Sequence, residues 1–225
     1  MRISVVIPVL DETNRINQVI EHVNYLSGNN SEIIVADGDP LGTTISSIAD
    51  ERVIKVPSEM GRGKQMNQGA AAATGEILLF LHADTFLPSR AFEKIEGVMR
   101  TGRYFGGAFD LGIDSSRTAL RIVEKAASLR SRITRIPYGD QAIFIRNDIF
   151  QSMGGFRDFP IMEDVDLMQR LKRDRRCIVI ISDKVRTSPR RWEKEGVVYC
   201  TLRNWTLITL YMLGVNPEKL VRFYR

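Results

Sequence analysis

A histidine and an aspartate stand two residues apart after the strongest strand signal in this sequence of 225 residues. The strand signal is EILLFL at residues 76–81, and His82-Ala83-Asp84 follows it directly. Because alternate residues of an extended chain point the same way, both side chains can face one ligand. One carboxylate and one imidazole suit Mn²⁺ or Mg²⁺ bridging two phosphates. The alternative is that Asp84 caps the next helix and that His82 is an ordinary polar residue.

Acids also follow two earlier apolar runs. Asp11 and Glu12 come after the first run, ISVVIPV, and Asp37 comes after IIVA. An acid after a strand can accept hydrogen bonds from a nucleotide base or a ribose. Asp37-Gly38 is equally an ordinary turn dipeptide, so Asp37 by itself does not decide between a binding site and a turn.

Cations suited to phosphate occur at two places. Gly61-Arg62-Gly63-Lys64 precedes a predicted helix, whose N-terminus favours an anion, although the loop lacks the GxxxxGK[ST] pattern of a P-loop. Arg190-Arg191-Trp192 joins two guanidinium groups, which suit a diphosphate, to an indole that can stack on a sugar or base. The alternatives are a flexible basic loop and an exposed surface turn.

Two further segments carry candidate acids. Glu163-Asp164-Val165-Asp166 opens a predicted helix, where the helix dipole favours acids without any catalytic role. The functional interpretation is a general base that takes the proton of an acceptor hydroxyl. Gly139-Asp140-Gln141, at the start of a predicted strand, could shape an acceptor pocket, and Gly-Asp is also a common turn dipeptide.

The elements that must position these residues alternate along the first half of the chain. Apolar runs predict strands at 3–7, 33–36, 53–56 and 76–81. Between them, helical periodicity predicts helices at 16–26, 44–49 and 63–74. This alternation is typical of a parallel α/β sheet, in which ligands collect at the carboxyl ends of the strands. The second half predicts strands at 106–113, 141–145 and 177–181 and helices at 120–133, 162–173 and 197–213. We expect one domain with a mixed sheet.

Composition limits the class of protein. Hydrophobic residues make up 44% and charged residues 26%, an ordinary globular balance. The net charge of +5 suits a phosphorylated substrate, an anionic membrane or nucleic acid, and does not choose among them. Cys177 and Cys200 are isolated and sit among apolar residues, which predicts buried free thiols and suits a reducing cytoplasm. No apolar stretch reaches the ~18 residues of a membrane span, and the N-terminal run is too short for a signal sequence.

Taken in order, several motifs resemble those of family 2 glycosyltransferases. They are MRISVVIPVLDE, IVADGDP, GRGKQMNQGAAAATGEILLFLHADT, PYGDQAIFIR, GGFRDFPIMEDVDLMQRL and SPRRW, and the resemblance runs from residue 1 to about 192. The HADT and RRW forms are most similar to a small bacterial subgroup associated with selenium or arsenosugars. The resemblance implies a GT-A (Rossmann-like) three-layer fold, a single domain over 1–225, and an inverting transfer. Residues 1–115 would form the nucleotide-sugar half, and residues 116–225 the acceptor half with a C-terminal helix.

The resemblance also implies roles for individual residues. Those matching donor-binding positions are Pro8, Glu12, Asp37, Arg62, Lys64, Arg191 and Trp192. Asp84 matches the last acid of the DXD metal motif, with His82 in place of its first acid. Asp164 matches the basic carboxylate of an ED pair with Glu163. Ser188 replaces the glutamine of QxxRW and long membrane helices are absent, so we do not expect processive polymerisation.

The predicted reaction moves a sugar from a nucleotide-sugar donor to a hydroxyl acceptor with the help of Mn²⁺ or Mg²⁺. A UDP-sugar is the family's commonest donor, and the acceptor is a small or lipid-linked molecule. We expect a cytoplasmic protein with peripheral contact to the inner membrane face and no nucleic-acid partner.

Two other classes of protein compete with this prediction. A sugar-phosphate nucleotidyltransferase shares a similar core, but would carry a GxGxR loop where Val9-Leu10-Asp11-Glu12 stands. A non-catalytic membrane or nucleic-acid binder would use the basic helix at 120–135 and the segment at 205–211.

Overall fold

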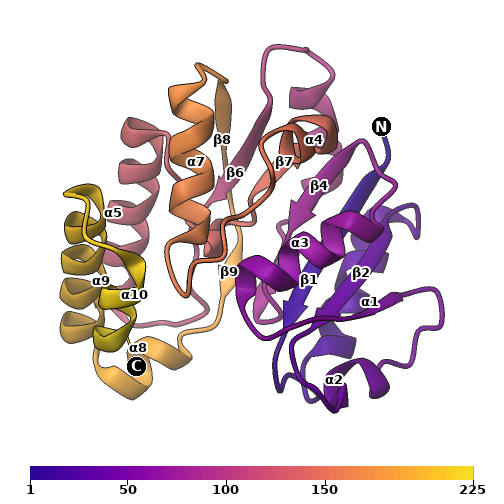
Figure 1. Cartoon of the computed structure of the whole chain (residues 1–225), viewed down its shortest axis with the longest axis horizontal. Coiled ribbons are helices and arrows are strands. Elements are labelled where there is room, and N and C mark those ends of the chain that lie inside the picture. Colours follow the sequence, from indigo (N-terminus) through magenta and orange to yellow (C-terminus); the bar gives the residue numbers. More distant parts are fainter. Residues whose placement is uncertain (225) are drawn as a thin grey trace.

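The computed structural model describes residues 1–224 and contains a seven-stranded sheet (Figure 1). Across the sheet the strands follow the order β3 (Ile54–Pro57), β2 (Glu32–Asp37), β1 (Ile3–Val9), β4 (Ile77–Phe80), β7 (Phe144–Arg146), β6 (Gly106–Asp110) and β8 (Ile178–Lys184). Only β7 runs antiparallel to its neighbours β4 and β6, and the other pairs are parallel. The predicted α/β architecture with a mixed, mostly parallel sheet is confirmed.

Helices cover both faces of this sheet and complete three layers. One apolar cluster joins the sheet to α1 (Ile16–Ser27), α4 (Ala91–Met99) and α5 (Thr118–Thr134). A second cluster joins the opposite face to α3 (Arg62–Ala72), α6 (Asn147–Ser152) and α7 (Glu163–Arg173). The short helix α2 (Thr43–Ser46) follows β2, and the C-terminal elements beside α5 are α8 (Arg190–Glu195), α9 (Val197–Met212) and α10 (Pro217–Leu220) (Figure 1).

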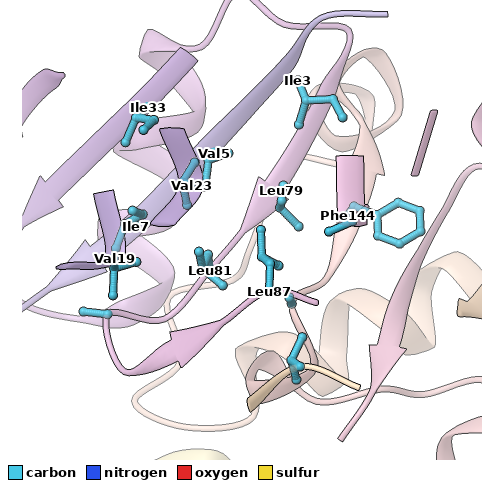
Figure 2. Packing of buried hydrophobic residues seen from close by; sticks show 14 of the residues in the cluster. Ile3, Val5, Ile7, Val19, Val23, Ile33, Leu79, Leu81, Leu87 and Phe144 are labelled. Atoms are coloured by element: carbon cyan, nitrogen blue, oxygen red, sulfur yellow. The ribbon is translucent and has the colours of Figure 1, made fainter. Parts of the chain in front are cut away.

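Alternation along β1 explains why all of its residues except Ser4 are apolar. Ile3, Val5 and Ile7 point to the cluster that includes Val19 and Val23 of α1 (Figure 2). Val6 points to the other cluster, beneath α3. Because side chains of a strand alternate between faces, a central strand covered on both sides is apolar at nearly every position. The one polar residue, Ser4, is buried and donates its hydroxyl proton to Glu32.

Helix α3 approaches β1 closely at Gly69. A Cβ added at Gly69 would lie 2.5 Å from Cγ1 of Val6. The absence of a side chain therefore sets the distance between this helix and the sheet. Since α3 begins at Arg62, the same contact helps to position a residue of the predicted site.

The structure contains three short helices that the sequence did not predict, α6, α8 and α10, and it departs from the predicted strands at three places. The strand predicted at 141–145 begins only at Phe144, because Gly139–Gln141 form a 3₁₀ turn. The strand predicted at 106–113 ends at Asp110, where its pairing with β8 shifts register. An unpredicted two-stranded ladder pairs β5 (Thr85–Phe86) with β9 (Arg186–Thr187). This ladder brings the segment after β4 beside the segment that leads to Arg190.

The two halves of the chain share the sheet. Strand β6 belongs to residues 1–115, yet it lies between β7 and β8 of residues 116–225. Each half thus completes the hydrogen bonding of the other. Within residues 1–224, no helix combines the length and the apolar character needed to cross a membrane.

Candidate active site

The predicted acids gather at one edge of the sheet because three strands end there. Strand β1 pairs in parallel with both β2 and β4, so their carboxyl ends lie side by side. Strand β7 runs the opposite way, and the Gly139–Gln141 turn that precedes it lies at the same edge. This topology joins the segment after β4 to residues more than fifty positions later in the chain.

A cavity of about 660 Å³ opens at this edge, a size typical of small-molecule sites. Predicted site residues that line it are Arg62, His82, Asp84, Gly139, Asp140, Asp164, Arg191 and Trp192. Other lining residues include Tyr138, Ile161, Met162, Arg190, Lys194, Asn204, Leu207, Ile208 and Tyr224. Predicted residues outside its lining are Pro8, Glu12, Asp37, Lys64, Gln141 and Glu163.

Asp84 lies in the cavity wall with its side chain 28% exposed. Its Oδ2 is 3.3 Å from Nη2 of Arg190, and the same guanidinium contacts Oε1 of Glu12 at 3.1 Å. Helix α4 takes Arg90 as its N-cap, and no side chain of the described chain caps it. Asp84 is therefore a cavity carboxylate and not a helix cap.

The imidazole of His82 faces the Gly139 turn. A Cβ at Gly139 would lie 2.8 Å from Nε2 of His82, so only glycine leaves this space open. Burial and the nearby Arg62 lower the pKa of His82 to about 4, against the opposing influence of Asp84 and Asp164. The ring is thus neutral at physiological pH and keeps a lone pair for a ligand.

The donor groups at Asp84 and His82 fit a divalent ion that binds together with a diphosphate. Across residues 1–224, no group of three or more His, Cys, Asp and Glu side chains is arranged to hold a metal. Mg²⁺ in phosphate-transfer sites usually takes one or two carboxylates, with substrate phosphates and water completing its shell. One half-buried carboxylate and one neutral imidazole meet that smaller requirement.

The two neighbouring acids at the start of α7 have different surroundings. Glu163 is buried and its Oε1 pairs with Nε of Arg62 at 2.9 Å. Asp164 reaches the cavity, where its Oδ2 accepts the N–H of Gly139 at 2.5 Å and its Oδ1 accepts that of Val165 at 2.7 Å. The structure thus brings Asp164 to the cavity, while Glu163 lies outside the cavity lining and forms an ion pair with Arg62.

Burial makes Glu163 an unusual carboxyl group. Its Oε2 is buried and has no hydrogen-bond partner within residues 1–224. Burial raises the pKa of Glu163 to about 6, although Arg62 acts to lower it. The group therefore changes charge near neutral pH inside the protein.

The Gly139–Gln141 turn is held from inside by Gln141. Its Oε1 accepts hydrogen bonds from Ser131 at 2.7 Å and from the N–H of Tyr138 at 3.1 Å, and its Nε2 donates to the Phe109 carbonyl at 2.8 Å. Gln141 is fully buried, so it shapes the pocket from beneath and does not line it.

Backbone strain marks the two elements that carry Asp140 and Asp164. Ala142, directly after the turn, has φ +50°, and Met162, directly before Glu163, has φ +69°. Non-glycine residues are uncommon in this left-handed region, and such positions cluster at functional sites. The turn and the start of α7 thus keep costly conformations next to the cavity.

Asp140 lines the cavity and has a perturbed pKa. Its Oδ1 is buried and finds no hydrogen-bond partner in the described chain. Burial, reinforced by Asp164, raises the pKa of Asp140 to about 6. Perturbed acids in a cavity are typical of functional sites, although structural networks produce them too.

The carboxylate of Asp37 accepts hydrogen bonds from the backbone. Its Oδ1 accepts the N–H of Asp39 at 3.0 Å, and its Oδ2 accepts those of Thr44 and Ile45 at 3.1 Å. The carboxylate therefore holds the start of α2. Contact between Asp37 and a nucleotide base stays a prediction, as does the donor role of Pro8, which pairs with Ala36 inside the sheet.

The two cations of the Gly61–Lys64 loop separate. Arg62 lines the cavity beside Glu163, as described above. Lys64 instead pairs with Glu59 at 2.7 Å and Asp158 at 3.4 Å, outside the cavity lining. A role of Lys64 toward donor phosphates stays a prediction, and it would require these ion pairs to open.

The Arg190–Trp192 segment contributes all three side chains to the cavity. Arg191 hydrogen bonds to the Tyr224 hydroxyl and stacks 4.3 Å from the centre of its ring. Trp192 packs against the larger apolar cluster, and its Nε1 is buried without a partner in residues 1–224. An indole N–H of this kind is available to an acceptor atom of a ligand.

Sequence reasoning gave no site role to Tyr138 or Tyr224, and it did not predict which carboxylates Arg190 contacts. Arg190 was visible as part of an arginine pair, but its contacts with Glu12 and Asp84 cross 178 and 106 residues. Tyr138 lies under Arg130, whose guanidinium carbon is 3.3 Å from the ring centre. No local pattern marks either tyrosine, because both reach the cavity through tertiary packing.

Residues 4–157 match the model of the family described as Glycosyl transferase family 2. The chain belongs to this family. The matched region contains Glu12 after β1, Asp37 at the end of β2, Asp84 after β4 and the Gly139–Gln141 turn. Asp164 and Arg190–Trp192 lie beyond it.

Curated relatives align with less than half of this family 2 chain. The glucosyl-3-phosphoglycerate synthase of Mycolicibacterium paratuberculosis is 33% identical over 111 residues, which are 44% of this chain and 34% of that protein. The dolichol-phosphate mannosyltransferase of Pyrococcus furiosus is 28% identical over 109 residues, 45% of this chain and 31% of that protein. The aligned segment thus spans about a third of each relative's length.

Solved structures share the fold of this family 2 chain at low identity. S. aureus TarS superposes with a TM-score of 0.62 and 15% identity, over 100% of this chain and 42% of that one. The mannosyltransferase PcManGT of Pyrobaculum calidifontis, solved with GDP-Man and Mn²⁺, gives a TM-score of 0.63 and 18% identity over 83% of this chain and 56% of that one. These likenesses support the GT-A (Rossmann-like) assignment of the fold.

Proposed function

We propose that this chain is an inverting glycosyltransferase that moves a sugar from a UDP-sugar to an acceptor hydroxyl with Mn²⁺ or Mg²⁺. One observation carries the proposal. Asp84 after β4 and Asp164 at the start of α7 line the same cavity, together with Arg190 and Arg191. This arrangement offers a carboxylate for a metal, cations for a diphosphate and a second carboxylate for a proton.

On the donor side, Asp84 and His82 would hold the divalent ion. When bound, the ion neutralises charge on the departing diphosphate. Arg190 already contacts Asp84, so a cation at Asp84 competes with it and leaves its guanidinium available to phosphate oxygens. Arg191 stands beside it in the same cavity, and fixed cations of this kind stabilise developing negative charge.

On the acceptor side, Asp164 would act as the general base. The acceptor oxygen forms a bond to the anomeric carbon as the bond from that carbon to the diphosphate oxygen breaks, and the acceptor proton passes to Asp164. The N–H groups of Gly139 and Val165 hold both carboxylate oxygens in place. Attack from the face opposite the leaving group inverts the configuration.

The acceptor half of the cavity has apolar walls. They come from Ile161, Met162, Leu207 and Ile208, beside Asp140 and the Gly139 turn. This lining supports an acceptor with an apolar part as well as a hydroxyl, which includes lipid-linked acceptors. We also propose that residues 1–115 bind the donor and residues 116–225 the acceptor within one domain.

Two finer assignments complete the proposal. The HADT and RRW segments support kinship with the bacterial selenium- and arsenosugar-associated subgroup. Cys177 and Cys200 are free thiols, which supports a reducing, cytoplasmic location.

A thermal-shift panel of nucleotide sugars, each with and without Mn²⁺, tests the proposal. A ligand that binds only the folded state raises the melting temperature, so the true donor raises it, and raises it further with metal. Incubation of that donor with candidate acceptors must then release a nucleoside diphosphate. Release of pyrophosphate from a nucleoside triphosphate and a sugar phosphate would instead favour the nucleotidyltransferase alternative.

We propose peripheral membrane contact through the outer face of α9. Its exposed side chains include Val198, Leu202, Trp205 and Met212, and its single charged residue, Arg203, is turned inward to pair with Glu195 at 2.6 Å. Ordinary surface helices expose charge instead. Residues 116–225 contain 22 Lys and Arg against 12 Asp and Glu, a net charge of +10 that favours an anionic surface.

Sedimentation with phosphatidylglycerol vesicles tests this contact. Leu202→Glu puts a charge into the exposed apolar face and is expected to reduce binding. Tyr25→Glu, at an exposed position of α1, is the matched control and is expected to bind like the unmodified chain. Equal binding by both variants would contradict a role for α9.

A further inference from the structure

A second cavity, of about 440 Å³, lies at the opposite edge of the sheet from the candidate active site. It is built where β6 and β8 begin and where α5 and α7 end. Five of its lining residues are cations, namely Arg103, Arg135, Lys172, Arg175 and Arg176, and no acid of residues 1–224 lines it. We call it the basic pocket.

The cations of the basic pocket lack counter-ions. Sixteen Lys and Arg side chains elsewhere in residues 1–224 form ion pairs, whereas none of the five pocket cations does. Lys172 donates only to the neutral carbonyl of Thr134, at 3.0 Å. The pocket is therefore a local concentration of uncompensated positive charge.

Helix dipoles account for only part of this charge. The C-termini of α5 and α7 both end here, and cations are favoured at such ends. Each C-terminus carries the equivalent of about half a negative charge. Two helix ends therefore offset roughly one of the five positive charges, and the remainder repel one another.

Two of the pocket arginines have a backbone conformation that is unfavourable for arginine. Arg135 has φ +57° and Arg175 has φ +55°, at helix ends where glycine is the usual residue. After α7, the N–H of Arg175 bonds to the Lys172 carbonyl and that of Arg176 to the Leu171 carbonyl, the pattern of a Schellman end. Arginine in this conformation has a steric cost that glycine avoids. Two arginines are thus kept at the pocket against local preference.

The pocket also combines a polar anchor with an apolar floor. Nη1 of Arg176 is buried without a hydrogen-bond partner in the described chain, and its guanidinium carbon lies 5.7 Å from the centre of the Phe105 ring. Met168, Leu171 and Ile178 supply apolar lining. A phosphate oxygen would satisfy guanidinium N–H groups that now lack an acceptor.

We infer that the basic pocket binds a phosphate group, borne by a soluble polyanion or by a lipid headgroup, separately from the donor cavity. The inference goes beyond the proposed transferase activity and does not depend on it. Uncompensated guanidinium groups around a recess of this size match the chemistry of phosphate recognition.

Cys177 provides a local readout of pocket occupancy. The prediction that both thiols are buried holds for Cys200 and is wrong for Cys177, which precedes β8, is exposed and lines the basic pocket. The rate of Cys177 alkylation by neutral iodoacetamide is measured by mass spectrometry, with EDTA and constant ionic strength. Sodium pyrophosphate is the soluble probe, and vesicles with phosphatidic acid are compared with phosphatidylcholine vesicles as the lipid probe. Because an occupied pocket shields the thiol, labelling should slow about tenfold at about nine-tenths occupancy.

The matched variants separate binding from folding. Arg135→Gly with Arg175→Gly removes two charges and relieves the positive-φ strain, so the fold is expected to persist. In this double variant the probes should no longer slow Cys177 alkylation, compared with the alkylation rate of the same variant without probe. Arg90→Gly removes an exposed arginine at φ +61° outside the pocket. In this control variant the probes should still slow Cys177 alkylation.

The probes then assign the source of the phosphate. Protection by pyrophosphate indicates a soluble ligand, and protection by phosphatidic acid vesicles alone indicates a lipid headgroup. An unchanged Cys177 rate with both probes, or equal protection in the double variant, would overturn the inference. Sugar transfer is measured separately, so failure here leaves the proposed function untouched.

Discussion

Single residues of similar chemistry are held in different ways around the active-site cavity. Asp84 has a guanidinium beside it, which a metal ion can displace. Asp164 has both oxygens on backbone N–H groups, which do not leave. The two carboxylates therefore suit different tasks. Asp84 can exchange a guanidinium for a metal ion, whereas Asp164 keeps a fixed orientation toward an acceptor.

Replacing each carboxylate by its amide separates these tasks. Asp84→Asn is expected to abolish the metal-dependent part of the donor-induced thermal shift. Asp164→Asn is expected to keep that shift and to lower kcat by about 10²–10⁴-fold, the usual contribution of a general base. Asp158→Asn, at an exposed acid outside the cavity lining, is the control. Near-normal turnover in Asp164→Asn would refute the assignment of the base.

The raised pKa of Asp140 predicts how stability changes with pH. Burial moves this pKa from 3.8 to about 6, so the folded protein binds the proton more tightly than the unfolded chain. The resulting stabilisation is present below about pH 4 and is lost as pH rises through about 6. Asp140→Asn cannot ionise, so its melting temperature relative to the unmodified chain should rise between pH 4.5 and pH 7.5. A constant difference across that range would contradict this account.

At the scale of elements, the sheet and its helices follow from local patterns, and the exceptions are short. The buried strand β4 is a continuous apolar run, β1 is apolar except at Ser4, and α1 has apolar residues at helical spacing. The β5–β9 ladder has two residues on each side, too few to carry a period. The sequence predicts the start of a strand at the Gly139–Gln141 turn. Local sequence does not reveal the turn, because the contacts that hold it come from Ser131 and Phe109.

The contact between α3 and β1 predicts opposite effects for one substitution in two helices. Gly69→Ala places a Cβ 2.5 Å from Val6 and should destabilise the protein by about 1–3 kcal/mol, the usual range for overpacking. Gly97→Ala in α4 meets no atom within 4 Å and should stabilise by about 0.5–1 kcal/mol through helix propensity. Urea unfolding of both variants measures the difference, and equal free energies would contradict the packing argument.

At the scale of the whole molecule, charge and topology divide the chain differently. Residues 1–115 have 10 Lys and Arg against 15 Asp and Glu, a net charge of −5, whereas residues 116–225 have +10. The sheet does not follow this division, because β6 lies between β7 and β8. The basic half therefore cannot detach without breaking strand pairing.

This interleaving predicts a single cooperative unfolding transition. Trp192 and Trp205, the two tryptophans, both lie in the second half, whereas far-ultraviolet circular dichroism reports on helices of both halves. The urea transitions followed by the two signals should coincide, as in two-state unfolding. A fluorescence transition at distinctly lower urea would indicate that the second half unfolds alone, contrary to the prediction of one domain.

The sequence by itself determined the α/β class, the order of most elements and the placement of acids and cations at strand and helix ends. Those features depend on neighbouring residues, through the periods of strands and helices and the chemistry of turns. Tertiary structure decided which candidates meet. It brought Arg190 to Asp84 and Gly139 to Asp164, turned Glu163 toward Arg62, and placed Lys64 with Glu59 and Asp158. Such contacts join residues far apart in the chain, and packing between elements sets them, so no local pattern records them.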